Sequence, residues 1–429
     1  MTTNPLVLRF EWVDVTPSPD RLSQATMARL EILLRGEPLI RVLDHRTKSY
    51  REAVRVPLHS LAEWFVSNWW FLWREYESLP PGKPAEFDSR HDLRHAADGF
   101  AFPSIILTPL GSQLRVQARP NRLTHTPIEF LGASEGIVDR DQVESALWEF
   151  IDTVVMRLRD EGCPETPLEQ QWRVLNELDN DELEFCQASA LLGLDPFDIS
   201  DNMSDSIIAV WNKTGCSYRE DLFAGAGPDS LTVASGWVED WKEKIANEQS
   251  GAAWSQLRAL GVNPAGTYAR PWDQGYALAR SVRKAMGAPS GRFEFAGSGD
   301  WAIQSIVEDI PAPGIDGLVA ANSPSCVLPP KNEAGGRFLL ARAAGDFLVR
   351  PNGSPSLLTS LSNTRQRLTR AFAAELLAPS EELRERLGPE PVTISESAID
   401  DLAEEYGVSG FVVRHQIKNH NLATVIDSE

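Results

Sequence analysis

An α+β protein of several domains is the fold class that this sequence predicts, on three observations. The 429-residue chain is longer than one ordinary domain, and 42% of its residues are apolar, enough for two or three buried cores. Short β-rich runs alternate with amphipathic helices at the start, and helical spacing with an acidic composition follows. We therefore predict an N-terminal α/β domain over 1–165, an acidic helical region over 166–265, and a mostly helical C-terminal domain with a small sheet over 266–429.

Two hairpins and two helices make up the predicted N-terminal domain. Two apolar runs within Ala28–Asp44 flank a Gly-Glu turn, which is typical of a β-hairpin. A second hairpin is expected over 99–120, and apolar residues recur at helical spacing from Leu61 to Trp73. The last element is an amphipathic helix over Arg140–Arg159. Its predicted inner face consists of Val143, Leu147, Phe150, Ile151, Val154, Val155 and Leu158.

The acidic helical region begins after Gly162–Pro167, a segment that we interpret as a linker. Within the region, Phe185–Lys213 has the rhythm of a helix-turn-helix. Its second helix would carry three aspartates and one lysine, so it would repel phosphate. We interpret this segment as a protein-contact or core module.

Charge and composition argue against several classes of protein. The net charge is −20, with the largest negative excess in residues 101–200, so direct nucleic-acid binding is unfavourable. The sequence has no uncharged apolar run of about 18 residues for a membrane span, and Arg9 and Glu11 interrupt the N-terminus too early for a signal peptide. The 4 cysteines lack CxxC spacing and are expected to be buried free thiols. We expect a cytoplasmic protein with an acidic surface.

Two neighbouring helices near the C-terminus carry the most specific pattern. The first is predicted over Gly335–Pro351 and the second over Arg365–Leu383, with Pro379 as a stop. Two strand-like runs, IDGLVAAN and SCVLPP, precede them. The pair resembles the signature of the ImmA/IrrE metallopeptidases, RF-x-x-AHE-x-x-H followed by E-x-x-A-N-x-FA-x-x-LL-x-P. The matching residues are Arg337, Phe338, Ala341, Gly345, Phe372, Ala373, Leu376, Leu377 and Pro379.

The resemblance spans roughly Pro271 to Ala423 and implies a zincin-like domain. In such enzymes two histidines one turn apart bind zinc, a neighbouring glutamate activates the metal-bound water, and a carboxylate from the next helix completes the ligands. The corresponding positions here are Arg342 and Asp346 for the histidines, Ala343 for the glutamate and Gln366 for the third ligand, or Leu368 at an offset of two. Arginine cannot lose its proton to become a ligand, and alanine offers no base. We therefore expect a pseudoenzyme that binds no zinc.

These positions also predict a local geometry. Arg342 and Asp346 are spaced i, i+4, so we expect an ion pair where two imidazoles would hold the metal. On an exposed helix such a pair contributes ~0.3–0.5 kcal/mol, so Arg342→Ala should cost well under ~1 kcal/mol. We also expect the two helices to pack together, with Arg342, Asp346 and Gln366 facing one cleft.

The sequence is compatible with three other interpretations. RFLLARAAGDFL fits an ordinary amphipathic core helix whose family match is chance. An active zinc metallo-endopeptidase would need rearranged ligands, such as Asp346 with other acids or histidines. His91 and His95, spaced i, i+4, would form a weak alternative metal-binding face if their segment is helical, although no third ligand is evident. The simpler interpretation of both is a pair of surface or packing histidines.

Ile394–Leu422 also has the cadence of a helix-turn-helix, with a turn at Gly407-Val408-Ser409. The first helix is acidic, which disfavours DNA binding. The second helix offers basic and amide side chains that DNA readers need: Arg414, His415, Gln416, Lys418, Asn419 and His420. In the ImmA/IrrE family such helices pack beside the peptidase core, so packing is the favoured interpretation.

The resemblance and the missing ligands together predict a function. We expect a catalytically inactive, regulatory or protein-binding protein that holds a protein partner in the former substrate cleft and needs no cofactor. The resemblance places such a protein in mobile-element regulation, a toxin–antitoxin pair or a stress response. The alternative is an active zinc metallo-endopeptidase that cleaves a regulatory protein, and tightly bound zinc would distinguish it.

Overall fold

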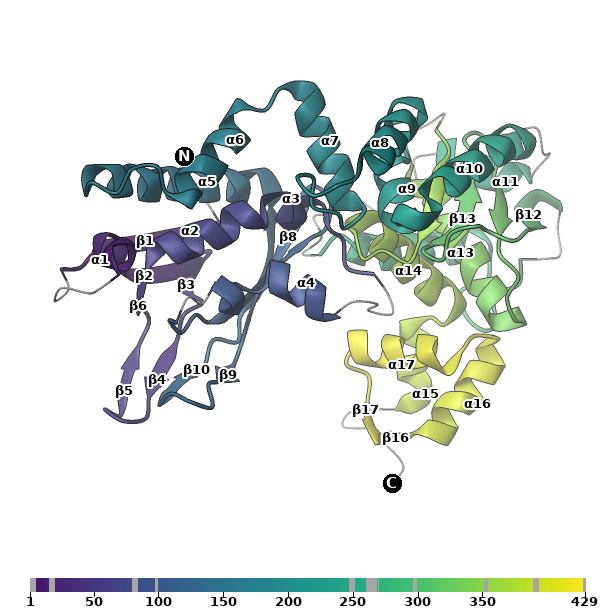
Figure 1. Ribbon diagram of the computed structural model, residues 1–429. Coiled ribbons are helices and arrows are strands. Elements are labelled where there is room, and N and C mark those ends of the chain that lie inside the picture. The colour runs from purple at the N-terminus through teal and green to yellow at the C-terminus, as the bar shows by residue number, and fades with distance from the viewer. Residues whose placement is uncertain are drawn as a thin grey trace. The chain divides into compact units, whose positions relative to one another are not determined.

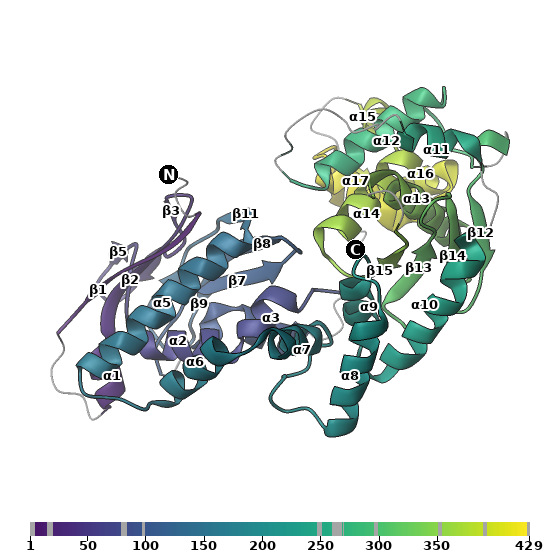
Figure 2. The ribbon, with the colours of Figure 1, turned by 90° about the horizontal axis from the view of Figure 1, so that it is seen from above.

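A computed structural model describes residues 5–14, 20–78, 84–96, 99–246, 251–259, 268, 270–295, 299–350, 354–388 and 393–426. The protein is mixed α/β, with 52% helix and 20% strand in several small sheets, which agrees with the α+β class. It divides into two compact units, Met1–Ile199 and Ser200–Glu429 (Figures 1 and 2). This division falls inside the region predicted as one acidic helical segment, and the boundary expected after residue 265 lies outside the described residues. No helix within the described ranges is long and apolar enough to span a membrane.

Three antiparallel sheets form the β-structure described in the first unit. The first contains β1 (Leu6–Trp12), β2 (Met27–Leu34), β3 (Glu37–Pro38) and β6 (Val54–Pro57). The second contains β5 (Ser49–Arg51), β4 (Val42–Asp44), β10 (Ile128–Phe130) and β9 (Asn121–Arg122) in that order. The third contains β11 (Glu135–Asp139), β8 (Gln113–Arg119) and β7 (Ser104–Pro109).

Both predicted hairpins are present, the first in a shortened form. The chain turns after β2 at Arg35 and Gly36, which have φ values of 52° and 87°, and then pairs with the short strand β3. Glycine adopts such positive φ values without steric cost, whereas Arg35 is held there by the tight turn. The rest of the predicted run, β4, pairs with β5 and β10 instead. The hairpin predicted over 99–120 is confirmed by the pairing of β7 with β8.

Most helices of the first unit share one hydrophobic core with these strands. The helix predicted around Leu61–Trp73 is divided into α2 (Leu58–Ser67) and α3 (Trp69–Arg74) at Asn68, whose Nδ2 donates to the Trp64 carbonyl. α5 (Arg140–Asp160) buries all the residues predicted for its inner face. The other described helices are α1 (Arg21–Thr26), α4 (Pro84–His91), the 3-10 helix Leu93–Ala96, α6 (Pro167–Glu177) and α7 (Asn180–Leu191).

The segment Gly162–Pro167, predicted as a linker, leads directly into a helix of the same unit. Pro167 is the first residue of α6, and the Thr166 hydroxyl accepts a hydrogen bond from the Glu169 amide at 3.2 Å. This is an ordinary helix start with a threonine cap and a proline in the first turn. The helix-turn-helix predicted over Phe185–Lys213 corresponds to α7 and α8 (Asp201–Lys213), which belong to different units.

A four-stranded sheet organises the second unit. Its order is β12 (Gln304–Val307), β14 (Ser325–Leu328), β13 (Ile315–Val319) and β15 (Ser356–Thr359). β12 and β14 are parallel, whereas β13 is antiparallel to both of its neighbours. β13 and β14 are the two strands predicted from the sequence. The helices that precede β12 are α8, α9 (Arg219–Ala226), α10 (Leu231–Ala246), α11 (Ala252–Ala259) and α12 (Asp273–Ala285), with 3-10 turns at Pro228–Ser230 and Gly299–Trp301.

The two helices with the family-like pattern are α13 (Glu333–Val349) and α14 (Thr364–Leu377), and they pack closely as predicted. A Cβ atom added to Gly345 on α13 would lie 2.5 Å from the Phe372 ring on α14, so only glycine fits at this crossing. α14 ends earlier than predicted, because Pro379 caps a separate helix, α15 (Ser380–Leu387), that contains Leu383. Pro351, the predicted end of the first helix, lies outside the described residues.

A helix-turn-helix forms the C-terminal part of the second unit. α16 (Glu396–Tyr406) ends at Gly407, whose left-handed φ of 64° turns the chain into α17 (Gly410–Asn419). Two short parallel strands, β16 (Thr393–Ser395) and β17 (Thr424–Ile426), flank the pair. The apolar side of both helices joins the hydrophobic core of the unit.

Candidate functional site

The four positions that the resemblance assigns to zinc chemistry lie together inside the second unit. Arg342, Ala343 and Asp346 are on α13, and Gln366 is in the first turn of α14. All four are buried, with Arg342 at 3% and Asp346 and Gln366 at 0% exposure. Arg342, Asp346 and Gln366 were expected to face one cleft; the structure brings Arg342 and Gln366 together, but the three side chains lie in the interior. Arg342 contacts Gln366, and both Arg342 and Asp346 contact residues of the strand β15.

Arg342 binds a carboxylate on a strand and an amide on the next helix. Its Nη1 lies 2.7 Å from Asp316 Oδ2 on β13, and its Nη2 donates to Gln366 Oε1 at 2.8 Å and to the Thr359 carbonyl at 2.7 Å. The predicted Arg342–Asp346 pair is therefore wrong. The reason is that both groups have better partners on β13, β15 and α14 than each other, so the i, i+4 spacing does not decide the pairing.

Asp346 is a fully buried carboxylate held by two arginines. Arg350 Nε lies 2.8 Å away, Arg365 Nη1 donates to the other oxygen, and the Ser356 hydroxyl adds a hydrogen bond. Burial by itself would raise the pKa of Asp346. The charges of Arg365 and Arg350 and the serine hydrogen bond outweigh that effect, so the pKa lies below its ordinary value and the group is ionised.

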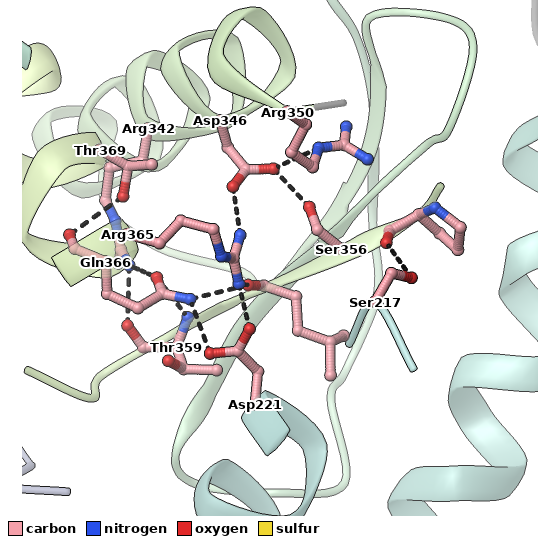
Figure 3. A network of polar contacts seen from close by, with 12 residues as sticks. Ser217, Asp221, Arg342, Asp346, Arg350, Ser356, Thr359, Arg365, Gln366 and Thr369 are labelled. Carbon is pink, nitrogen blue, oxygen red and sulfur yellow. Dashed lines mark hydrogen bonds and ion pairs between the residues drawn. The ribbon is translucent and has the colours of Figure 1, made fainter. Parts of the chain in front are cut away.

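Arg365 joins Asp346 to a second aspartate from a distant helix. Its guanidinium also binds Asp221 on α9 and the Leu357 carbonyl, and Figure 3 shows it between the two carboxylates. Burial would lower the pKa of Arg365, but the two carboxylates raise it overall. A fixed cation thus lies beside the position where the resemblance expects a metal ligand.

Gln366 has every hydrogen-bonding group of its amide satisfied. Oε1 accepts from Arg342 Nη2 and, at 3.1 Å, from the Thr359 amide. Nε2 donates to the Leu357 carbonyl at 2.9 Å and to Asp221 Oδ1 at 3.4 Å. The side chain therefore cannot bind another ligand without losing existing hydrogen bonds.

Two glycines allow α9 to deliver Asp221 to this network. A Cβ atom on Gly314 would lie 2.3 Å from the Gly225 carbonyl oxygen, and one on Gly225 would lie 3.3 Å from that of Gly314. The close approach sets α9 against β13 and the edge strand β15. Asp221, one turn before Gly225, then reaches Arg365 and also accepts from Asn363 Nδ2 at 3.1 Å.

The donor set does not fit zinc. Zinc sites need three or four deprotonated nitrogen, sulfur or carboxylate ligands around one point. Among the residues that the structure describes, no group of three or more His, Cys, Asp or Glu side chains could hold a metal ion. At the family-like positions the carboxylates of Asp221, Asp316 and Asp346 are each already paired with a guanidinium group.

His91 and His95 do not form a shared face. α4 ends at His91, and His95 is in the following 3-10 helix. His91 is fully buried, with Nδ1 2.7 Å from the Leu107 carbonyl oxygen, Nε2 3.3 Å from Glu75 Oε2 and its ring stacked on Phe87. His95 interacts with its neighbour Arg94. The alternative of a two-histidine metal face is therefore not supported, and His91 is a packing residue.

The polar side chains of α17 mostly bind within the unit. Gln416 is buried and donates to Glu375 Oε2 and to the Ala378 carbonyl, both at 2.8 Å. Arg414 pairs with Glu396, and Asn419 donates to the Tyr276 hydroxyl at 3.1 Å. These three residues would have to give up internal contacts before they could read a DNA base.

All four cysteines are free thiols, and three are buried as expected. Burial raises the pKa of Cys326 to about 12 and that of Cys186 to about 12. Cys216 is exposed in the loop between α8 and α9, so the expectation of a buried thiol is wrong at this position.

Asp221, Arg350 and Arg365 were not among the site residues expected from the sequence. Arg350 follows Asp346 by one helical turn, and Arg365 precedes Gln366, so both lay within reach of the motif. Asp221 is separated from Arg365 by 144 residues and has no local signal. No protein-family model, curated protein or solved structure matches this chain.

Proposed function

We propose that the chain is a non-catalytic, protein-binding relative of the ImmA/IrrE metallopeptidases. The observation that carries the proposal is the hydrogen-bonded network through Arg342, Gln366, Asp221, Arg365 and Asp346, which uses the positions of all three zinc ligands. The position of the general base is Ala343, which cannot accept a proton.

The network supports a structural role for the former catalytic positions. A guanidinium keeps its charge at any physiological pH, so Arg342 and Arg365 act as permanent cations. Two cations held by three aspartates replace the charge that a metal would supply, and they join α9, α13 and α14 to the sheet. Because the positions are buried, a protein partner would contact the half-buried side chains around them, which include Asp316, Arg367 and Arg370.

The biological setting follows from the resemblance alone. We propose a regulatory role in the cytoplasm, in the context of a mobile element, a toxin–antitoxin pair or a stress response. Proteins encoded beside this chain are the natural first candidates for its partner. Binding of such a partner, without its cleavage, would then be the function of the protein.

The test measures binding and cleavage on the same samples. The full chain is mixed with each protein encoded by a neighbouring gene, with and without added zinc, and binding is measured by calorimetry. We expect a stable complex with one of them and an unchanged intact mass of that partner. A shortened partner in the zinc-containing sample would contradict the proposal and favour the metallo-endopeptidase, and failure of every neighbour to bind would contradict the protein-binding role.

A further inference from the structure

Most of the arginines around β15 are paired with an aspartate, and, within the described ranges, one arginine at the end of the network is not. Arg342 is paired with Asp316, and Arg350 and Arg365 are matched by Asp346 and Asp221. Arg370, one turn after Gln366 on α14, has no carboxylate within ion-pair distance in the part of the chain that the structure describes. The network therefore ends in one unmatched positive charge.

Among the residues that the structure describes, Arg370 donates to neutral oxygen atoms alone. Its Nη1 donates to the Thr359 carbonyl at 3.3 Å and its Nη2 donates to the Leu361 carbonyl at 2.5 Å. A guanidinium has five N–H groups, so about three have no acceptor among the described residues. The two carbonyls fix the guanidinium in place. The side chain is half-buried rather than fully enclosed.

The surroundings of Arg370 favour a negative charge. Burial and the neighbouring charges of Arg342 and Arg367 lower the pKa of Arg370, and only Asp316 opposes them. Arg367 lies one turn earlier on α14, with its guanidinium 5.0 Å from the centre of the Trp272 ring. Two neighbouring arginines, one of them over an aromatic ring, are typical of a surface that binds planar anions.

The first turns of α14 carry positive side chains, although the positive end of the helix dipole also lies there. Its first turns contain Arg365, Arg367 and Arg370 and no acidic residue, although negative charge is favoured at a helix N-terminus. Asp221 and Asp346 compensate for the charge of Arg365.

We propose that Arg370 anchors a site for a single carboxylate group, supplied by an acidic side chain of the protein partner. This inference rests on the proposed protein-binding function and specifies the chemistry of the partner. A carboxylate matches the planar fork of a guanidinium and carries the one charge that the network lacks. A polyanion such as nucleic acid is disfavoured, because the chain as a whole carries a charge of −20.

Acetate is the probe for the site in the full-length protein. The Nε–Hε resonance of Arg370 in protein labelled with ¹⁵N-arginine, assigned by its loss in Arg370→Lys, is followed during titration with sodium acetate. Sodium chloride at equal ionic strength is the reference, and Arg173, a 53% exposed arginine of the other unit, is the internal control. We expect a saturable shift for Arg370 with acetate alone. A shift of Arg370 that stays linear, like that of Arg173, would overturn the carboxylate site.

A second experiment, on the complex with the protein partner, tests the carboxylate site separately from the proposed protein-binding function. In the complex, Arg370→Gln should weaken binding roughly tenfold or more, whereas Arg173→Gln should leave it unchanged. Equal affinity of both variants would overturn the assignment of the carboxylate to the partner. Saturable acetate binding without any partner complex would contradict the proposed function while supporting the carboxylate site.

Discussion

Arg342 Nη2 lies 2.8 Å from Gln366 Oε1, so two positions that would coordinate one zinc ion in an ImmA/IrrE-like enzyme are hydrogen-bonded to each other. The bond connects α13 with α14, and the same guanidinium reaches β13 through Asp316. A hydrogen bond and an ion pair of Arg342 therefore link α13 to α14 and to β13 at these positions. The role of each residue in this arrangement can be tested by its substitution.

Arg342→Ala should destabilise the protein by about 3 kcal/mol, because it leaves Asp316 without its ion-pair partner and removes one hydrogen bond each from Gln366 and the Thr359 carbonyl. This is more than the sequence alone suggests, since the side chain is buried and its partners are not on the same helix face. Chemical denaturation of the variant measures the loss. Arg119→Ala, at an exposed arginine, is the control and should change the free energy of unfolding by less than about 0.5 kcal/mol. A similarly small change for Arg342→Ala would contradict the buried-network interpretation.

Asp346→Asn should show a pH-dependent loss of stability. The pKa of Asp346 is lowered in the folded protein from 3.8, so its stabilising effect is fully present above pH 3.8 and disappears as the pH falls through the lower folded value. At pH 7 the variant should lose roughly 3 kcal/mol, because Arg350 and Arg365 lose their shared anion. The difference from wild type should shrink below pH 3.8, whereas the exposed control Asp152→Asn should show no such trend. A pH-independent difference would mean that Asp346 acts by shape alone.

Arg365→Ala should create a site that responds to divalent cations. Without the guanidinium, Asp221 and Asp346 face the vacated space together with the Leu357 carbonyl, and hard cations such as Ca²⁺ prefer oxygen ligands. The variant should be less stable than wild type, and added Ca²⁺ should raise its melting temperature in a manner reversed by chelation. The Asp221→Asn/Arg365→Ala double variant should lose most of this response. If Ca²⁺ has no effect on either variant, the guanidinium does not stand in for a metal cation.

Gly345→Ala and Gly336→Ala are a matched pair on α13. The added methyl group at Gly345 would meet the Phe372 ring at 2.5 Å, which should cost about 1–3 kcal/mol by overpacking. Gly336 has no atom within 4 Å of the equivalent position, so the same change there should stabilise the helix by about 0.5–1 kcal/mol. Thermal melting of both variants measures the contrast. Equal effects would show that α13 and α14 do not cross at Gly345.

The spacing of apolar residues was sufficient to predict elements that pack against close neighbours in the sequence. The inner face of α5 follows from apolar residues at helical spacing, and the hairpin of β7 and β8 follows from two apolar runs around a glycine turn. The crossing of α13 and α14 was predicted because Gly345 and Phe372 belong to a recognisable pair of motifs. These predictions succeed because each depends on residues within one or two neighbouring elements.

The sequence did not predict which charged residues far apart in the chain form ion pairs. Asp346 and Arg342 are spaced for an i, i+4 ion pair, yet each binds residues that the fold brings from elsewhere. Asp221 reaches Arg365 only because Gly225 and Gly314 let α9 approach the sheet. A charged side chain can pair with any opposite charge that the fold brings near it. The spacing along one helix therefore indicates only one of its possible partners.

The zinc content of the full chain tests the central claim most directly. The protein is purified without a metal-chelating tag, dialysed with and without added zinc, and analysed by inductively coupled plasma mass spectrometry. Because Arg342, Asp346 and Gln366 are held in hydrogen bonds and ion pairs, we predict far less than one zinc per chain in both samples. About one zinc per chain that survives dialysis would contradict the account and indicate a metallopeptidase with rearranged ligands.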